Sequence, residues 1–409
     1  MSVSNPPFAP LAVSAFTATS ALGCGLAAHF GSLRDARTGL RPNDFSSAPL
    51  PCWIGRVADL EQTTLPADLS SWDCRSNRLA WLGLNQDGFL DRVRVARERY
   101  GAARIALILG TSTSSIYATE TAYRRLDADG GMPDDMLLPA IHAPHSLVGF
   151  VADALGLQGP ALTVSTACSS SAKAFANAER MIRLGLVDAA VVGGVDTLCD
   201  SVLFGFNALE LVSSEPCRPF DANRDGISIG EAAGFALLER VDAAPGALRL
   251  RGYGEASDAH HMSTPHPDGL GAELALRDAL DRAGLRAEQV DYINLHGTAS
   301  LKNDEVEAAL VSRLFPATTR ASSTKGFSGH TLGAAGILEA VLALLSIQHG
   351  LIPGNLGGGH LGESTPDPNC GPQFAWRNEQ RDIEIALSNS FGFGGNNACL
   401  VFARAQAAA

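Results

Sequence analysis

The sequence lacks a basic run and any excess of positive charge. Its 31 lysines and arginines are outnumbered by 43 aspartates and glutamates, which gives a formal net charge of −12. A chain this acidic argues against a nucleic acid as the main partner, because nucleic-acid binding depends on clustered positive charge. The overall balance leaves room for a local basic patch.

Closely spaced cysteines, a signal segment and a long apolar run are also missing. No two of the eight cysteines form a CxxC pair, so a zinc ribbon or a dithiol redox site has no support. With 46% hydrophobic residues the chain can bury a large core without a disulfide framework. The first residues lack the basic and apolar stretches of a secretory signal, and no uninterrupted apolar run reaches the roughly 20 residues of a membrane helix. We therefore expect a soluble, cytoplasmic protein without a membrane span.

Short apolar runs alternate with longer helical patterns. Residues 103–110, 160–164 and 188–196 are predicted to be buried strands, and a helix is predicted over 172–186. The last two strands and the helix between them have the size of a βαβ unit. The length of 409 residues is compatible with two or three domains or with one large fused unit.

The second half of the chain repeats this organisation. Strands are predicted at 230–240, 246–257 and 290–297, an apolar helix at 331–350, and two strands around a Gly-rich turn within 383–405. Each half then contains a strand, a Ser/Thr loop with one reactive side chain, and an apolar helix. The reactive side chain of this loop is Cys168 in the first half and His330 in the second. The repeated order predicts an internal duplication. Residues 35–75 and 353–376 are predicted to be surface loops.

Cys168 stands in the stretch ALTVSTACSSS, where the predicted strand ends and the predicted helix begins. Backbone N–H groups and the dipole at a helix start favour negative charge, so both would lower the pKa of a thiol there. The surrounding serines and threonine also suit a helix N-cap. Free cysteine is equally common in protein cores, so this stretch alone leaves a nucleophile and a packing residue as even alternatives.

Two histidines and a lysine lie in polar loops. His296 follows a predicted strand in NLHGTAS, and Lys325 and His330 precede the apolar helix in SSTKGFSGHTLGAAG. His330 is predicted at or near the start of this helix, where the helix dipole disfavours an imidazolium. A neutral imidazole can donate a hydrogen bond from one nitrogen. The small residues 333–336 would let other backbone pack closely on this helix. The structural alternatives are a hydrogen-bonded core histidine for His296 and a basic surface loop for the second segment.

A Gly-rich turn closes the set of candidate segments. The backbone of NSFGFGGNN, at 389–397, can approach a ligand closely. It has neither the strand–GxGxxG–helix context of a dinucleotide site nor the GK[ST] of a phosphate loop, so it is weak evidence alone.

Together, TVSTACSSSAKA, NLHGTAS followed by NDEVE, SSTKGFSGHTLGAAG and NSFGFGGNN resemble the motifs of β-ketoacyl-acyl carrier protein synthases of the elongating type. Order and spacing agree over nearly the whole chain. The resemblance implies the thiolase fold: two duplicated α/β halves, each with a five-stranded mixed sheet, in αβαβα layers, usually as an obligate dimer. We place the half that carries the cysteine at 1–245 and the half that carries both histidines at 246–409.

The resemblance assigns the chemistry residue by residue. Cys168 would accept an acyl chain as a thioester, and His296 and His330 would serve a malonyl thioester. Loss of CO2 leaves an enolate whose charge two N–H donors stabilise, and its carbon attacks the acyl thioester. The backbone N–H groups of Cys168 and Phe393 would hold the resulting oxyanion, and Phe391 and Phe393 match the Gly-rich gate beside the cysteine.

The remaining motif residues have supporting roles by similarity. Lys325 matches the lysine between the two histidine motifs, with Glu307 as its expected partner. Thr298 and Ser300 match positions that hydrogen-bond the pantetheine arm. Neither metal nor nucleotide nor another cofactor is implied, because acyl carrier protein carries the substrates on its phosphopantetheine arm.

Acyl carrier proteins are acidic, so a basic docking patch is expected. Four arginines are candidates, each with an ordinary solvated arginine as the alternative: Arg75, Arg78, Arg124 and Arg125. The dimer partner is expected to be a second copy or a chain-length-factor-like subunit.

The predicted function is decarboxylative Claisen condensation in type II fatty acid or polyketide elongation. Departures from the family pattern at Ser300-Leu301, at the N-terminus and over 35–75 suggest a dedicated pathway such as aryl polyene assembly. A chain-length factor would lack the nucleophile, and a coenzyme A-dependent thiolase would need a second cysteine in the Gly-rich turn. A cysteine hydrolase would leave His330 and Lys325 unexplained.

Overall fold

The computed structural model describes residues 9–137, 139–356 and 364–405. Within them, ten strands form one continuous sheet in the order β12-β11-β15-β16-β10-β1-β9-β7-β5-β6, and the short β2 (Gly23–Cys24) pairs with β1. Five neighbouring strands come from each half of the chain. Those of the first half are β1 (Leu11–Ser20), β5 (Ile105–Gly110), β6 (Ala161–Val164), β7 (Ala189–Asp196) and β9 (Ala232–Arg240). Those of the second are β10 (Leu248–Ser257), β11 (Tyr292–Asn294), β12 (Arg320–Ser322), β15 (Ile385–Gly392) and β16 (Asn396–Ala403).

The two halves have the same topology. From the middle outward, the first half runs β1-β9-β7-β5-β6 and the second runs β10-β16-β15-β11-β12. In each half the first two pairings are antiparallel and the last two are parallel. The first strand of each half also has a register shift at its start, between Val13 and Ala15 in β1 and between Leu250 and Gly252 in β10. This agreement confirms the predicted duplicated fold.

The halves join in the middle of the sheet. β1 pairs with β10 through three residue pairs, among them Leu11 with Leu250. Strands β9 and β10, which follow each other in the sequence, therefore do not pair with each other, because β1 lies between them. The sequence pattern gave no sign of this arrangement, since it depends on a strand more than 200 residues away.

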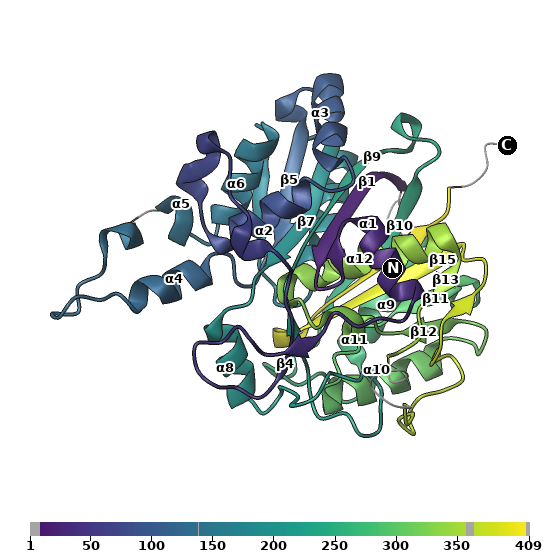
Figure 1. Cartoon of the computed structure of the whole chain (residues 1–409). Helices are drawn as coiled ribbons and strands as arrows, with labels where there is room; N and C mark the ends of the chain where they lie inside the picture. Colours follow the sequence, from purple (N-terminus) through teal and green to yellow (C-terminus); the bar gives the residue numbers. More distant parts are fainter. Residues whose placement is uncertain (1–8, 138, 357–363, 406–409) are drawn as a thin grey trace.

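Two helices lie between the sheet halves. Helix α7 (Ser170–Arg183) contacts β5 and β7 of the first half and β10 and β16 of the second, and α12 (Ala335–His349) contacts β1, β9, β15 and α7. Helices α2 (Arg75–Leu84), α3 (Phe89–Tyr100) and α6 (Ser146–Leu155) cover the outer face of the first half. Helices α9 (Leu270–Ala283) and α10 (Leu301–Leu314) pack into the outer core of the second half (Figure 1). The result is an αβαβα arrangement.

Helix α12 is apolar because it is surrounded by protein. Residues 332–349 are long and apolar enough to cross a membrane, but 89% of this stretch is buried inside the structure. A helix that is hydrophobic on all sides is expected to be a core element. It ends at Gly350, whose φ of 64° is the left-handed cap conformation that glycine favours.

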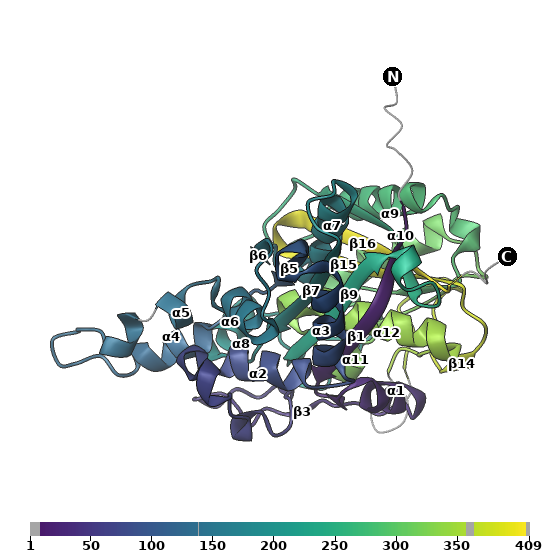
Figure 2. The same ribbon diagram turned by 90° about the horizontal axis from the view of Figure 1, so that it is seen from above.

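The predicted loop segments are largely irregular. Before α2 begins at Arg75, residues 35–75 contain only the short strands β3 (Arg41–Pro42) and β4 (Trp53–Gly55) and two 3-10 turns, and the described part of 353–376 contains no helix. A different segment, which contains α4 (Ile116–Tyr123) and α5 (Pro139–His142), projects away from the body of the molecule (Figure 2).

Candidate active site

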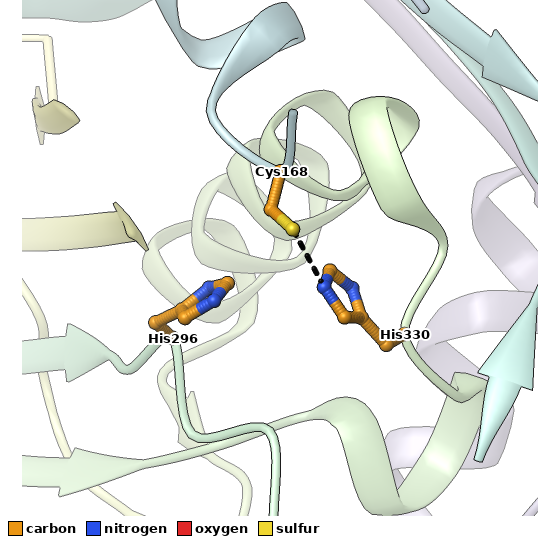
Figure 3. A group of neighbouring side chains, drawn as sticks. All are labelled: Cys168, His296 and His330. Atoms are coloured by element: carbon orange, nitrogen blue, oxygen red, sulfur yellow. Dashed lines mark hydrogen bonds between the residues drawn. The ribbon is translucent and has the colours of Figure 1, made fainter. Parts of the chain in front are cut away.

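Cys168, His296 and His330 meet at one cavity, although they come from three separate elements. Cys168 precedes α7, His296 follows β11, and His330 lies in the loop before α12 (Figure 3). The cavity has a volume of about 360 Å³, and all three residues line it. Both halves of the chain therefore contribute to one site.

A sharp turn presents the thiol of Cys168. The residue before it, Ala167, has a φ of 52°, which is uncommon for a residue with a side chain. Ser169 is the N-cap of α7, so Cys168 lies just outside the helix start. Its Sγ lies 3.0 Å from Nε2 of His330. The backbone N–H of Phe393 is near enough to this sulfur to lower the pKa of the thiol.

Burial determines the direction of the pKa shift of the nucleophile, and this direction is opposite to the one expected from the helix start. It raises the pKa of the Cys168 thiol to about 11, although the Lys325 ammonium and the Phe393 N–H act to lower it. The expectation that the helix start gives a low thiol pKa is therefore wrong. At neutral pH the group is a thiol, and its reaction as a nucleophile requires a proton acceptor. Nε2 of His330 lies at the distance required for that acceptor.

His330 is fixed through its backbone and is neutral. Its N–H donates to the carbonyl of Ser228 at 2.7 Å, and its carbonyl accepts from the N–H of Gly230 at 2.9 Å. Burial, with the nearby Lys325 charge as the second cause, holds the pKa of His330 well below its usual range. Nδ1 has no hydrogen-bond partner among the residues that the structure describes.

The ring of His296 stands nearly perpendicular to that of His330, with 5.4 Å between ring centroids and 87° between planes. Burial, the Lys325 charge and His330 all hold its pKa well below the usual range. Nζ of Lys325 lies 3.4 Å from Nδ1 of His296. Because an ammonium only donates, Nδ1 is the acceptor and the proton of this neutral imidazole is on Nε2.

The expected pairing of Lys325 with Glu307 is wrong. Nζ of Lys325 pairs with Glu339 of α12 and also donates to the carbonyl of His296. Glu307 instead accepts the backbone N–H groups of His296 and Gly297, at 2.9 and 2.8 Å. Burial raises the pKa of both Glu307 and Glu339 to about 7, and Lys325 acts against that rise at Glu339.

Sequence reasoning missed Glu339, although a signal was present. It is the one Asp, Glu, Lys or Arg within the apolar helix predicted at 331–350. A charged group in such a helix must be paired, since an unpaired buried charge is very unfavourable. Glu307 was found, but its hydrogen bonds show that it holds the backbone that carries His296.

Thr298, Ser300, Phe391 and Phe393 all line the cavity, as the sequence predicted. The hydroxyls of Thr298 and Ser300 lie 2.9 Å apart and hydrogen-bond each other. Phe391 lies 5.8 Å from the ring of His296, and Phe393 stacks on Phe206 of α8 (Asp200–Ala208) at 5.6 Å between ring centroids.

The Gly-rich turn lies directly against the nucleophile loop. A Cβ at Gly392 would be 2.9 Å from the carbonyl oxygen of Thr166 and 3.3 Å from the N–H nitrogen of Cys168. Only a residue without a side chain allows this approach. The backbone of the Gly-rich turn is thereby brought next to the backbone nitrogen of Cys168. The joint role of the Cys168 and Phe393 N–H groups stays a prediction.

The four candidate docking arginines do not form one exposed patch. Arg75 is buried and pairs with Glu231 and Glu61, so its assignment to a docking surface is wrong. The guanidinium of Arg75 lies inside the protein and binds these two carboxylates.

The other three arginines are at the surface and have local partners. Arg78 bonds both carboxylate oxygens of Asp73 at 2.6 Å. Arg124 pairs with Asp200, and Nε of Arg125 donates to the carbonyl of Thr121 at 3.2 Å. Their role in docking stays a prediction.

The three central residues could in geometric terms hold a metal ion. Their ligand atoms lie within 4.8 Å of one another. The ammonium of Lys325, 3.4 Å from His296, opposes a second cation at this position. The donor set is therefore a poor fit for a cation.

Comparisons with known proteins agree with this arrangement. Residues 79–244 match the family model "Beta-ketoacyl synthase, N-terminal domain", and residues 248–358 match "Beta-ketoacyl synthase, C-terminal domain". Nodulation protein E of Rhizobium meliloti is 36% identical over 74% of this chain and 76% of that protein. The mitochondrial 3-oxoacyl-[acyl-carrier-protein] synthase of Arabidopsis thaliana is 40% identical over 62% of this chain, a match that spans 59% of the plant protein.

Solved structures show the same fold over the full length. A chain from the complex of a ketosynthase (ApeO) with its chain length factor (ApeC) from Xenorhabdus doucetiae has a TM-score of 0.86 and 36% identity, covering 98% of this chain and 100% of that one. A chain of the ishigamide ketosynthase/chain length factor has a TM-score of 0.86 and 28% identity, covering 97% and 99%.

Proposed function

This chain belongs to the β-ketoacyl synthase family, and we propose that it condenses an acyl group held on Cys168 with malonyl-acyl carrier protein to give β-ketoacyl-acyl carrier protein. The observation that carries the proposal is the cavity where a thiol, two neutral imidazoles and the N–H of Phe393 meet. One nucleophile and several donors in a buried site suit acyl transfer and enolate chemistry.

In the loading step, Sγ of Cys168 attacks the acyl thioester of the carrier protein. Its proton passes to Nε2 of His330, 3.0 Å away. The N–H groups of Cys168 and Phe393 hold the oxyanion of the tetrahedral intermediate. The carrier thiolate then leaves and takes the proton from His330, so the imidazole is neutral again and the acyl group is on Cys168.

In the second step the malonyl thioester loses CO2. The electron pair of the broken C–C bond forms an enolate, whose oxygen accepts N–H donors from Nε2 of His296 and His330. Because Nδ1 of His330 is unpartnered within the described residues, both tautomers are open to this ring. It can accept a proton during loading and donate one during decarboxylation.

The enolate carbon then attacks the acyl group on Cys168. The new C–C bond forms, the C–S bond breaks, and the cysteine thiolate takes up a proton from solvent to restore the thiol. Each residue in this sequence holds or moves a proton at a named atom, and we propose that neither metal nor another cofactor takes part.

The alternatives fit less well. A thiolase needs a second cysteine in the turn at 391–395, which contains none, and Cys399 is buried in β16. A chain-length factor needs no nucleophile, yet Cys168 is present with both histidines.

The decisive experiment compares Cys168→Ala with Cys399→Ala. Intact-mass analysis after incubation with acyl carrier protein should show one acyl group on the wild type and on Cys399→Ala, and none on Cys168→Ala. Condensation with malonyl-acyl carrier protein should follow the same pattern. Condensation by folded Cys168→Ala would refute the proposal, and loss of activity in Cys399→Ala alone would favour a thiolase.

We further propose that the partner is a chain-length-factor-like subunit and that the pathway is a dedicated one such as aryl polyene assembly. The ketosynthase/chain length factor neighbours at 36% and 28% identity support the partner class. The departures at Ser300-Leu301 and over 35–75 support the dedicated pathway. A panel of carrier-bound acyl groups, assayed with the chain alone, tests both: faster turnover of saturated chains by a homodimer would contradict them.

A further inference from the structure

The hydroxyl of Ser171 connects the segment that carries Cys168 to the segment that carries His330. Ser171 lies in the first turn of α7, three residues after Cys168, and is fully buried. Its Oγ donates to the carbonyl of Gly333 at 2.6 Å and accepts from the N–H of Ile337 at 2.9 Å. Gly333 comes three residues after His330, so one hydroxyl ties together the two elements on either side of the Sγ–Nε2 contact.

The carboxylate of Asp196 holds the same histidine segment from the end of β7. Its Oδ2 accepts the N–H of Ala334 at 3.1 Å. Its Oδ1 accepts the hydroxyls of Thr111 and Thr113, both at 2.7 Å, and the N–H groups of Ser112 and Thr113 at 2.9 and 2.7 Å. Each of these partners is a donor, so the NH2 of an amide at this position would face donors.

The segment after His330 has an unusual backbone conformation and lies close against Asp196 and Ser112. Leu332 has a φ of 56°, a conformation that residues with side chains rarely adopt. A Cβ at Gly333 would lie 2.8 Å from Oδ2 of Asp196 and 2.8 Å from the N–H nitrogen of Ser112. Strain of this kind persists where the surrounding structure over-determines the backbone.

We propose that Ser171 and Asp196 are positioning residues that keep the imidazole of His330 at hydrogen-bond distance from the thiol of Cys168. Neither lines the cavity, and both hold the backbone at 333–337. Asp196 also acts at a distance, since its charge raises the pKa of the Cys168 thiol. Proton transfer needs heavy atoms within hydrogen-bond reach, and a misplacement of about 1 Å can cost about 100-fold in rate. The inference deepens the proposed function and rests on it for its kinetic readout, whereas thiol alkylation is independent of that function.

The test compares Ser171→Ala with Ser346→Ala. Ser346 is a matched control, because it is a buried serine on α12 whose Oγ has no hydrogen-bond partner in the described structure. Alkylation of Cys168 by iodoacetamide is followed from pH 6 to 10 by peptide mass spectrometry, which separates it from the other cysteines. Steady-state kcat and KM for both carrier-bound substrates are measured alongside.

We expect Cys168 of Ser171→Ala to be alkylated about 10-fold more slowly at pH 7.5. The rise of the alkylation rate with pH should occur at a higher pH than in the wild type. We also expect kcat to fall about 10-fold or more while KM stays within about two-fold, and Ser346→Ala to behave as wild type. If Ser171→Ala does not fold, Asp196→Asn should show the same fall in kcat with KM within about two-fold. The alkylation readout stays with Ser171, because loss of the Asp196 carboxylate also removes a charge that raises the pKa of Cys168.

Equal alkylation profiles for Ser171→Ala and Ser346→Ala would overturn the proposal. So would a lower kcat with an unchanged profile, because Ser171 would then act elsewhere than on the Cys168–His330 contact. If the wild type is alkylated at Cys168 but condenses no acyl pair, the proposed function fails, and the alkylation comparison still decides the role of Ser171.

Discussion

At the scale of single residues, burial and one ammonium group set the charges of the site. Burial is the largest cause of the lowered pKa of His296 and His330, and Lys325 is the second. Glu339 pairs with Lys325, so the positive charge is held in place inside the protein. Both imidazoles are neutral at pH 7, while the thiol of Cys168 is protonated.

Lys325→Met should move the acid limit of acyl loading to higher pH. Without the ammonium, an imidazolium is less unfavourable, so the pKa of His330 rises and the ring loses its acceptor nitrogen at a higher pH. The shift should be partial, since burial remains. Single-turnover loading of Cys168 from pH 5 to 8 measures it, with Lys302→Met as a control for loss of one charge at the cavity rim. An acid limit that stays in place, or moves equally in both variants, would count against this role of Lys325.

At the scale of elements, the site depends on how closely α7 and α12 approach. A Cβ at Gly336 would lie 2.5 Å from the N–H nitrogen of Ala172 and 2.8 Å from its Cβ. The small residues at 333–336 indicated this approach in the sequence, because they offer backbone without bulk. The partner helix was not identifiable, since it comes from the other half of the chain.

Gly336→Ala should therefore destabilise the protein, despite the higher helix propensity of alanine. We expect a loss of about 1–3 kcal/mol from overpacking. Gly205→Ala in α8, where an added Cβ meets nothing within 4 Å, should instead stabilise by about 0.5–1 kcal/mol. Urea unfolding of both variants measures the difference. Equal and stabilising effects would show that the two helices do not pack as closely as described.

At the scale of the whole molecule, the halves share one central core. Residues of both α7 and α12 pack together with residues of strands from each half, among them Phe175, Ile337 and Phe402. The β1–β10 pairing makes the sheet continuous across the boundary. We therefore expect the two halves to unfold as one unit rather than as independent domains.

The distribution of tryptophan allows a direct measurement. Trp53, Trp72 and Trp81 are in the first half and Trp376 is in the second. In a variant with the first three changed to Phe, unfolding followed by the fluorescence of Trp376 should coincide with unfolding followed by far-UV circular dichroism. Two separated midpoints would mean that the second half unfolds independently.

The sequence by itself determined the local features. It predicted the strands and helices of the βαβ unit, the apolar helix before Gly350, and the candidates Cys168, His296, Lys325 and His330. These follow from hydrophobic periodicity and from residue types next to one another, which are local properties.

Only the tertiary structure decided what those residues meet. It paired Lys325 with Glu339 rather than Glu307, buried Arg75, and placed β1 between β9 and β10. It also made Cys168 a thiol that faces His330, because burial outweighs the Lys325 charge and the Phe393 N–H, which both lower the pKa of the thiol. The reason is physical: desolvation and ion pairing depend on which distant segments enclose a group, and spacing along the chain does not contain that information.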